Sequence, residues 1–508
     1  MIDFGPSDLS RRDLLRGVAG ASAASLIAGA CSPTGGGGSP GVVTRPWHVV
    51  RPATRDEVAG YVERPSLQRG ASQTLHLNCV GADAELPVEV AVHRTGWYGG
   101  DGAETVLRES VVAPPQQALT SMVDPVTNLC RADWAPVLTF DTATGGNPWP
   151  SGVYLVQLTA TSGKQSYVPF TLRDDHSNAS ILVVQNHLTW QAYNTAGAYD
   201  LYHDGYAVSF QRPYKHDAVR ASFGAGEYLW LEYRIVRWLE REGFDVTYVA
   251  DFDLHSNEVP DSTKVILLPG HSEYWTHEMR QNVERAMAER GVGLVALGAN
   301  TCYWRGRLEG GTGDWPGDYV LYKTSSGQAH ADDPLRTHPT LASRLYRSLS
   351  GGAEQLLLGG QFRGWVDLND YDGPLLNSTA MVADDVTHPV FAGTGITRGM
   401  RFDGLCGGEY DTKHTDYPAP SGVRMAFTTP LDYLHSSWHD LTRWEFQQSA
   451  LHEKTFAGGV TSRVFNAGTY TWAWGLDDFS LESHRYDFAD ERIQALTANI
   501  VRWAAKEL

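Results

Sequence analysis

The pattern of apolar residues changes near Asp175, and this change constrains the fold more than any other feature of the sequence. Before it, residues 88–93 and 151–160 alternate apolar and polar positions, as strands with one buried face do. After it, residues 181–184 and 265–268 are unbroken apolar runs, typical of strands buried on both faces. The sequence therefore predicts an all-β domain followed by an α/β domain.

The all-β domain is expected over residues 47–175. Alternating segments also occur at residues 74–80 and 165–172, and clusters of Gly, Asp, Asn and Pro separate the segments. Short strands at this spacing predict an immunoglobulin-like β-sandwich. Cys79 and Cys130 fall within this domain, and their spacing leaves open whether they form a disulfide.

The α/β domain is expected over residues 176–508. Helical patterns at residues 228–242 and 276–290 alternate with strand patterns at residues 246–249 and 293–298. Alternating strands and helices, with continuously apolar strands, predict a parallel sheet with right-handed crossovers. Towards the C-terminus the pattern weakens, and only a terminal helix is predicted.

The N-terminus carries the marks of a targeting segment. Residues 1–34 predict a twin-arginine export signal, because Arg11-Arg12 lies in a charged stretch that a modest apolar region follows. Cys31 follows Ala-Gly-Ala, as in a lipoprotein cleavage site, and a Gly-rich linker occupies residues 35–46. We therefore expect export to the periplasm or the exterior, or a lipid anchor on Cys31 that tethers the chain to the membrane at the cell surface.

The charge balance excludes one class of partner. The 508 residues include 41 Lys and Arg against 59 Asp and Glu, a net charge of −18. Affinity for phosphate backbones comes mainly from Lys and Arg, so nucleic acid is not an expected partner. The sequence also contains no P-loop, no zincin motif and no zinc-finger spacing, which removes the commonest nucleotide and zinc sites.

One strand end combines a histidine and a carboxylate. Pro269-Gly270 ends the apolar run, and His271, Ser272 and Glu273 follow within one turn. In open α/β sheets ligands bind at the carboxyl ends of the strands. Two other interpretations stay open: Glu273 caps the next helix, or Ser272 is a nucleophile on an elbow whose second glycine is missing.

Polar side chains also follow other predicted strands and turns of the α/β domain. Tyr193 lies in a loop after the strand at residues 181–184, and Asn300 lies just beyond the strand that ends near residue 298. Glu409 follows a Gly-rich turn. Ordinary turn chemistry, or an acid facing solvent, explains each of these alone. Their repetition at strand ends favours a site.

A set of motifs recurs in a characteristic order over residues 60–508. They are residues 94–100 (Arg-Thr-Gly-Trp-Tyr-Gly-Gly), 150–154, 191–194, 212–214, 233–243, 270–275 (Gly-His-Ser-Glu-Tyr-Trp), 300–305 and 404–411. In order and spacing they resemble the large (β) subunit of N,N-dimethylformamidase and the proteins that share its C-terminal domain. The resemblance implies a glutamine-amidotransferase-like, or Rossmann-like, α/β domain after the sandwich.

The same resemblance implies a mononuclear Fe(III) bound by two tyrosines and a glutamate, which correspond to Tyr154, Tyr193 and Glu273. Phenolates and carboxylates are hard anionic donors that suit such an ion, and three of them balance its charge. The resemblance assigns His271, Asn300 and Glu409 to the active site as catalytic residues. Glu409 is expected to take a proton from water and pass it to the leaving amine, while Asn300 and His271 orient the substrate or stabilise the oxyanion.

These features together predict an exported, iron-dependent amidohydrolase-like protein that acts on a C–N amide bond of a small substrate and is expected to form a homo-oligomer. The sequence departs from the family in two ways. The family enzyme is cytoplasmic and works with a small subunit, and residues 325–334 follow a branch without assigned activity. The alternatives are a non-catalytic cell-surface protein that binds glycans or peptides on the same scaffold, and a hydrolase with Ser272 as nucleophile.

Overall fold

The computed structural model describes residues 45–508 apart from 198, 216–224, 314, 325, 367–377, 432–444 and 480–487. The predicted export signal, Cys31 and all but the end of the predicted linker lie outside the described residues. The described part of the chain is rich in β-strands and has few helices. None of its helices is long and apolar enough to cross a membrane.

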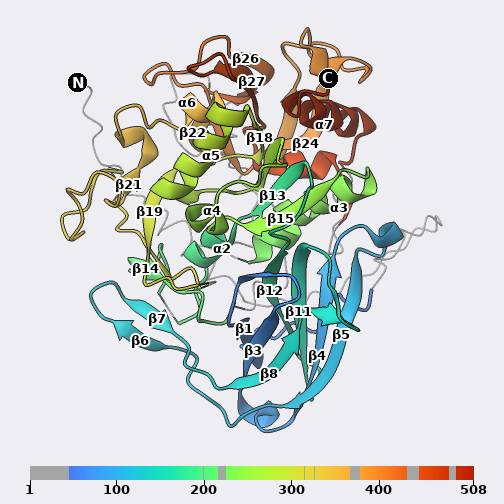
Figure 1. The fold of residues 1–508 in the computed structure, drawn as a ribbon, viewed down its shortest axis with the longest axis vertical. Coiled ribbons are helices and arrows are strands. Elements are labelled where there is room, and N and C mark those ends of the chain that lie inside the picture. Colours follow the sequence, from blue (N-terminus) through green and yellow to red (C-terminus); the bar gives the residue numbers. More distant parts are fainter. Residues whose placement is uncertain are drawn as a thin grey trace, which may run out of the picture.

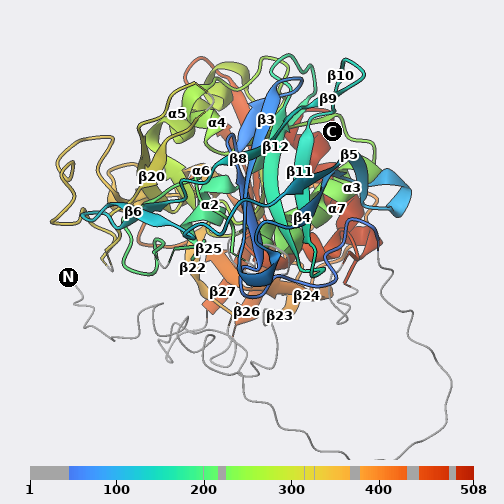
Figure 2. The same cartoon turned by 90° about the horizontal axis from the view of Figure 1, so that it is seen from below.

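The N-terminal domain consists of two sheets that share one hydrophobic core. The smaller sheet has the order β1 (Val58–Val62), β3 (Ser72–Cys79) and β8 (Pro136–Asp141), and the larger has the order β2 (Ser66–Gln68), β12 (Gln165–Arg173), β11 (Gly152–Ala160), β4 (Pro87–Thr95) and β5 (Ala103–Val112). Leu75 and Leu77 of the first sheet pack with Val90, Val156 and Val168 of the second. Figure 1 shows this domain below the α/β domain, and Figure 2 views it from below.

Strand β11 serves two cores at once. Tyr154 and Val156 lie in the core between the sandwich sheets. Val153 and Leu155, which alternate with them, lie in a core shared with the α/β domain. Both faces of this strand are therefore buried, because successive side chains of a strand point to opposite faces.

The second domain is organised around a seven-stranded sheet. Its order is β15 (Val246–Ala250), β13 (Ile181–Gln185), β16 (Val265–Gly270), β18 (Gly293–Gly298), β28 (Thr461–Asn466), β27 (Glu445–Thr455) and β26 (Arg424–Leu431). The first five strands pair in parallel, whereas β28 with β27 and β27 with β26 pair antiparallel. The predicted parallel sheet is confirmed for the strands that the apolar runs indicated.

Helices cover both faces of this sheet. They are α2 (His187–Ala192), α3 (Tyr233–Arg241), α4 (Asp253–Ser256), α5 (His277–Arg290), α6 (Gln355–Leu358) and α7 (Glu491–Ala504). Val183 and Leu267 point to the face packed by α3 and α7, while Leu182 and Ile266 point to the face packed by α4 and α5. Figure 1 shows α5 on one side of the sheet, with α3 and α7 on the other. This two-sided burial explains why the central strands are continuously apolar.

Small sheets that the sequence did not predict accompany the main one. Their strands are β14 (Ala207–Val208), β20 (Asp318–Val320), β19 (Trp304–Glu309), β17 (Tyr274–Thr276) and β21 (Arg344–Leu345), the pairs β22 (Gln361–Trp365) with β25 (Glu409–Thr412) and β23 (Ser378–Val382) with β24 (Arg401–Gly407), and, in the all-β domain, β6 (Ser121–Asp124) with β7 (Leu129–Arg131) and β9 (Ala143–Thr144) with β10 (Asn147–Pro148). Strand β17 begins directly after Glu273, and β25 begins at Glu409.

The helix predicted at residues 228–242 differs from the observed one. A π-helical turn, η4 (Tyr228–Glu232), precedes α3 and widens the first part of the helix. Helix α5 starts at His277, and its N-cap is Thr276, whose hydroxyl accepts the Met279 amide. The interpretation of Glu273 as the cap of this helix was therefore wrong, since strand β17 separates the two.

Two groups of contacts join the domains. Arg94 Nη2 donates to Glu240 Oε1 at 2.8 Å, and Arg173 Nη1 donates to Asp253 Oδ1 at 3.1 Å. The β6–β7 hairpin also reaches across, where Thr127 accepts the Tyr206 amide at 2.8 Å. Because the domains share a core, the boundary at residue 175 and the immunoglobulin-like and Rossmann-like labels stay predictions.

The four cysteines among the described residues are all free and buried. Cys79 lies in the sandwich core, whereas Cys130 lies on the β6–β7 hairpin. The disulfide that the spacing left open is therefore not formed in this structure.

Candidate functional site

The turn after β16 places three polar side chains inside the protein. His271, Ser272 and Glu273 have 0–2 % of their surface exposed. Gly270 permits this turn because its φ is 63°, and a Cβ there would lie 3.0 Å from Leu231 Cβ. The turn is thus packed tightly against η4, and the side chains that follow it are fixed.

Two tyrosine hydroxyls gather on the Glu273 carboxylate. Tyr193 OH donates to Glu273 Oε2 at 2.7 Å, and Tyr202 OH donates to Tyr193 OH at 2.6 Å. Tyr202 OH also lies 3.2 Å from Glu273 Oε2. These three residues, called the Tyr–Tyr–Glu cluster below, bring three oxygen atoms from two separate segments within hydrogen-bond distance of one another.

Local structure holds the two tyrosines in place. Tyr193 is the C-cap residue of α2, the short helix that follows β13. The Tyr202 amide donates to Asp200 Oδ1 at 2.6 Å, and Asn128 of the β6–β7 hairpin donates to the Asp204 carbonyl at 2.7 Å. The β6–β7 hairpin of the sandwich domain therefore contacts the loop that carries Tyr202.

A lysine and a further tyrosine border the cluster. Tyr274 OH lies 2.6 Å from Tyr202 OH and accepts a hydrogen bond of 2.9 Å from Lys323 Nζ. Lys323 Nζ also lies 3.4 Å from the centre of the Tyr202 ring. Burial, followed by the charge of Glu273, raises the pKa of Tyr274 well above its ordinary value. The Lys323 ammonium group therefore lies beside the Tyr–Tyr–Glu cluster.

The predicted catalytic residues meet on the other side of Glu273. His271 Nε2 lies 3.1 Å from Glu273 Oε2 and 3.3 Å from Glu409 Oε2. Glu409 Oε2 also accepts hydrogen bonds of 2.5 Å each from Asn300 Nδ2 and from Tyr470 OH. The structure thus brings Glu273, His271, Asn300 and Glu409 together from two strand ends, those of β16 and β18, and from a small sheet.

Asp411 accepts hydrogen bonds that help to hold Asn300 in place. Its Oδ1 accepts the Asn300 amide at 2.9 Å, and its Oδ2 accepts Asn466 Nδ2 at 2.8 Å. Asn300 adopts a left-handed φ of 54°, which asparagine tolerates better than most residues. Burial raises the pKa of Asp411 to about 6, although both hydrogen bonds oppose the shift.

The charges around His271 are unusual for a buried histidine. Its Nδ1 faces Glu227 Oε1 at 3.3 Å, while Nε2 faces Glu273 and Glu409. Burial lowers the pKa of His271, but Glu227 and Glu273 outweigh burial and raise this pKa above its ordinary value. The imidazole is therefore surrounded by carboxylates that can accept hydrogen bonds from it.

Tyr154 is not part of this site. Its ring stacks on Phe170 at 5.2 Å inside the sandwich, and its hydroxyl donates to the Pro150 carbonyl at 2.6 Å. Burial raises the pKa of Tyr154, which disfavours a phenolate. Tyr202, which sequence reasoning missed, is a second tyrosine whose hydroxyl contacts Glu273 and Tyr193. The signal for it was a tyrosine in the same strand-end loop as Tyr193.

The hydrogen bonds of Ser272 are not those of a serine nucleophile. Its hydroxyl accepts Trp275 Nε1 at 3.0 Å. Both nitrogens of the neighbouring His271 face carboxylates instead. A serine nucleophile needs a base on its hydroxyl, so this geometry does not support a Ser272 hydrolase.

The Tyr–Tyr–Glu cluster fits a hard metal ion. Neighbouring ligands of an octahedral ion at about 2.0–2.1 Å lie about 2.8–3.0 Å apart. The corresponding oxygen separations here are 2.6, 2.7 and 3.2 Å. Among the described residues no three His, Cys, Asp or Glu side chains form a usual metal-binding group. A metal at this site would therefore depend on tyrosine.

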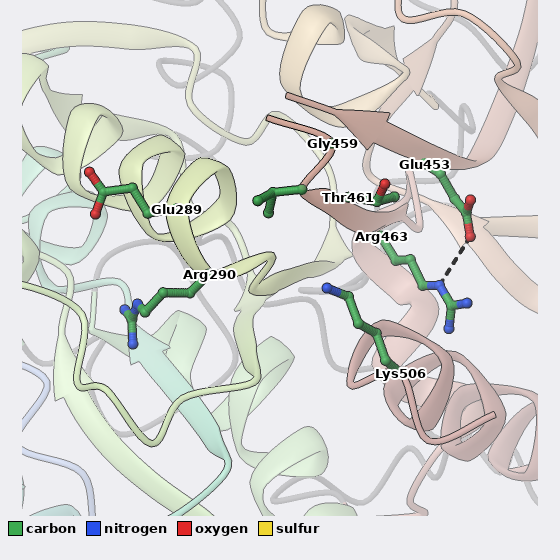
Figure 3. A pocket seen from close by; sticks show the side chains of 8 residues that line it. Glu289, Arg290, Glu453, Gly459, Thr461, Arg463 and Lys506 are labelled. Carbon is green, nitrogen blue, oxygen red and sulfur yellow. Dashed lines mark hydrogen bonds and ion pairs between the residues drawn. The ribbon is translucent and has the colours of Figure 1, made fainter. Parts of the chain in front are cut away.

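A surface pocket of about 570 Å³ lies elsewhere, near the end of α5 and the β27–β28 turn (Figure 3). Its lining includes Arg290, Glu453, Arg463 and Lys506. Arg463 pairs with Glu453 at 3.0 Å, and Arg290 donates to backbone carbonyls. None of the predicted site residues lines this pocket. Its two arginines, Arg290 and Arg463, already form hydrogen bonds or ion pairs within the protein.

Comparison with known families gives one extended match. The profile described as "N,N-dimethylformamidase beta subunit-like, C-terminal" matches residues 89–487. The chain belongs to this family. The dimethylformamidase-like match spans most of the all-β domain and nearly all of the α/β domain, and at a coarse level it makes the chain hydrolase-like.

Other comparisons add little to the dimethylformamidase-like assignment. No curated protein sequence matches the chain significantly. Matching solved structures include the cycloisomaltooligosaccharide glucanotransferase of Paenibacillus sp. complexed with cycloisomaltoheptaose, at 9% identity and a TM-score of 0.16. The match covers 48% of this chain and only 28% of that one, so it carries no argument.

Proposed function

We propose that this protein is an iron-dependent hydrolase that cleaves a C–N amide bond. The observation that supports the proposal is the contact between the Tyr–Tyr–Glu cluster and the catalytic group of His271, Asn300 and Glu409, through His271 Nε2 and Glu273 Oε2 at 3.1 Å. Oxygen donors for a hard ion and groups that can move a proton are thus adjacent in one buried place.

Tyr193, Tyr202 and Glu273 would hold the metal. When ionised, two phenolates and one carboxylate supply three negative charges, which neutralise Fe(III) and make its burial tolerable. Such an ion polarises a carbonyl and lowers the pKa of water. Lys323, 2.9 Å from Tyr274 OH, adds a positive charge beside the phenolates. It thereby helps to keep them ionised.

Glu409 is the proposed proton carrier. Hydrolysis joins the oxygen of water to the carbonyl carbon, and a proton of that water ends on the departing nitrogen. Glu409 accepts this proton and delivers it to the amine as the C–N bond breaks. The donors Asn300 and Tyr470, each 2.5 Å from Glu409 Oε2, orient the carboxylate.

Asn300 and His271 are proposed to bind the substrate oxygen. Asn300 Nδ2 lies 3.5 Å from His271 Nε2, and both groups lie next to Glu409 Oε2. Preorganised donors of this kind stabilise the negative charge that develops on the carbonyl oxygen. His271, Asn300 and Glu409 are completely buried, which favours a compact amide over a polymer as substrate.

The proposal is tested with the chain from residue 35 onwards, purified from iron-supplemented cells. We expect about one iron per chain by elemental analysis, visible absorbance from phenolate–iron charge transfer, and release of dimethylamine or ammonia from small amides such as N,N-dimethylformamide and formamide. Iron-free, colourless protein would refute the metal site. Iron-loaded protein inert towards a panel of small amides would favour the binding-protein alternative.

We also propose that the chain is exported by the twin-arginine route, on the evidence of Arg11-Arg12 in the charged stretch. Residues 1–34 fused to a reporter should deliver it outside the cytoplasm, and replacement of both arginines by lysine should retain it inside. Cys31→Ser should release the exported reporter from membranes if Cys31 is lipidated, and should change nothing if it is not.

A further inference from the structure

Both ring nitrogens of the buried His271 face carboxylates, but the carboxylates differ in origin. On the Nε2 side lie Glu273 and Glu409, which belong to the proposed reaction site. On the Nδ1 side lies Glu227, whose Oε1 is 3.3 Å away and which is itself completely buried. Glu227 has no place in the proposed reaction, so its presence beside His271 requires another explanation.

The fold fixes Glu227 against His271. Glu227 directly precedes the π-helical turn η4, and π-helical turns often occur at functional sites. This turn packs on the Gly270 turn so closely that a Cβ on Gly270 would lie 3.1 Å from Glu232 Cγ. Within the same turn, Glu232 is engaged differently, since its Oε1 accepts Trp190 Nε1 at 2.7 Å. The packing therefore sets the distance between Glu227 and the imidazole.

We infer that Glu227 is a positioning residue: it accepts a hydrogen bond from His271 Nδ1 and thereby directs Nε2 at Glu273 and Glu409. An ionised carboxylate can only accept a hydrogen bond, so the nitrogen it faces must carry the hydrogen. The partner of one imidazole nitrogen decides which role the other plays. With Nδ1 hydrogen-bonded to Glu227, the ring is oriented so that Nε2 points towards Glu273 and Glu409.

The catalytic consequence of this inference rests on the proposed function, but the position of the proton does not. In an imidazole held from Nδ1, Nε2 stays aligned with Glu409 throughout the reaction. Without that hold, the ring can rotate, and Nε2 is then no longer fixed where it is proposed to donate to the substrate oxygen. Glu227 thus acts through His271.

The test measures the proton directly. The full chain is labelled with ¹⁵N-histidine and purified without iron, so that its resonances stay sharp. His271 signals are assigned as those lost in His271→Asn. We expect a protonated Nδ1 in the unmodified chain, loss of that protonation in Glu227→Met, and its retention in Glu227→Gln, whose amide oxygen can still accept. Glu232→Gln, in the same helical turn, should leave the His271 signals unchanged.

An unprotonated Nδ1 in the unmodified chain, or a protonated Nδ1 that persists in Glu227→Met, would overturn the inference. If Glu227→Met does not fold by circular dichroism, Glu227→Ala provides the same comparison. Kinetics add a second readout: for a small amide, Glu227→Met should lower kcat about 10–100-fold, with KM and iron content nearly unchanged, and Glu227→Gln should recover part of the loss. Absence of hydrolysis in the unmodified chain would refute the proposed function and leave the result for the proton intact.

Discussion

The hydroxyl groups of Tyr193 and Tyr202 lie 2.6 Å apart, and both contact the same oxygen of Glu273. Neutral phenols can share a carboxylate through hydrogen bonds alone. The arrangement also has the oxygen spacing of a metal site, in which the same atoms become ligands once their protons leave. The two possibilities differ in what happens when one hydroxyl is removed.

Tyr202→Phe should lower iron content more than about tenfold and abolish most of the visible absorbance, because it removes one of three proposed ligands. Tyr154→Phe is the matched control. It removes only the hydroxyl that donates to the Pro150 carbonyl, so iron and colour should persist. Elemental analysis and absorbance of both variants measure the effect. Loss of iron in Tyr154→Phe alone would restore Tyr154 as the ligand and remove Tyr202.

Glu409→Gln should lower kcat for a small amide by about 10²–10⁴-fold, since a neutral amide cannot take a proton from water. Iron content should stay unchanged, because Glu409 is outside the proposed ligand set. Steady-state kinetics and elemental analysis measure both effects. The exposed Asp403→Asn on β24 is the control and should keep full activity. Equal activity in Glu409→Gln and the control would rule out Glu409 as the proton carrier.

Asp411 should make stability fall as pH rises from about 4 to about 6. Its pKa is raised to about 6 in the fold by burial, whereas an unfolded aspartate titrates near about 3.9. Between these values the folded chain binds more protons than the unfolded chain, so ionisation of Asp411 costs on the order of 3 kcal/mol of stability above pH 6. Denaturant unfolding at several pH values should show this slope, and Asp411→Asn should reduce it.

Asp385 provides a control of opposite sign. Hydrogen bonds from Arg424 hold its pKa well below the ordinary value. The stability it contributes is present at neutral pH and is lost as pH falls through the folded pKa. Asp385→Asn should therefore leave the slope between pH 4 and 6 unchanged. A slope that also survives in Asp411→Asn would show that another buried acid produces it.

Arg94→Met should destabilise the protein by about 3–5 kcal/mol, because it leaves Glu240 without its guanidinium partner at the contact between the domains. Both side chains of this pair are largely buried, at 10% and 16% exposure. The exposed pair of Arg398 and Asp384 is the comparison, and Arg398→Met should change stability by less than about 1 kcal/mol. Thermal or denaturant unfolding measures both, and equal effects would contradict a structural role for the Arg94 pair.

The sequence predicted part of the site because the ends of buried strands can be recognised from their apolar runs. The apolar run of β16 and the glycine after it located His271 and Glu273, and the same logic located Tyr193 and Asn300. The structure joins these groups to Glu409 as expected at the carboxyl edge of a parallel sheet. Strand β17 and the small sheet that carries Glu409 were missed, because strands of three to five residues leave little periodic signal.

Tyr154 shows why the second tyrosine of the candidate site could not be predicted. In a strand with one buried face, the alternation reveals which side chains point inwards. The alternation expected over residues 151–160 fails at residues 153–156, which are apolar or aromatic without interruption, because one face meets the sandwich core and the other meets the α/β domain. The sequence therefore held no information on which core Tyr154 enters. Only the assembled fold shows that it faces away from Glu273.

The two-sided burial of β11 has a consequence for how this chain can be divided. A strand that completes two cores cannot be removed without exposing both, so the sandwich is not an independent module that could be detached or exchanged. We expect the two halves to unfold in a single cooperative transition, with no range of denaturant in which one is intact alone. Such a chain can acquire new specificity in its loops, whereas recombination at the border between the halves would destroy the protein.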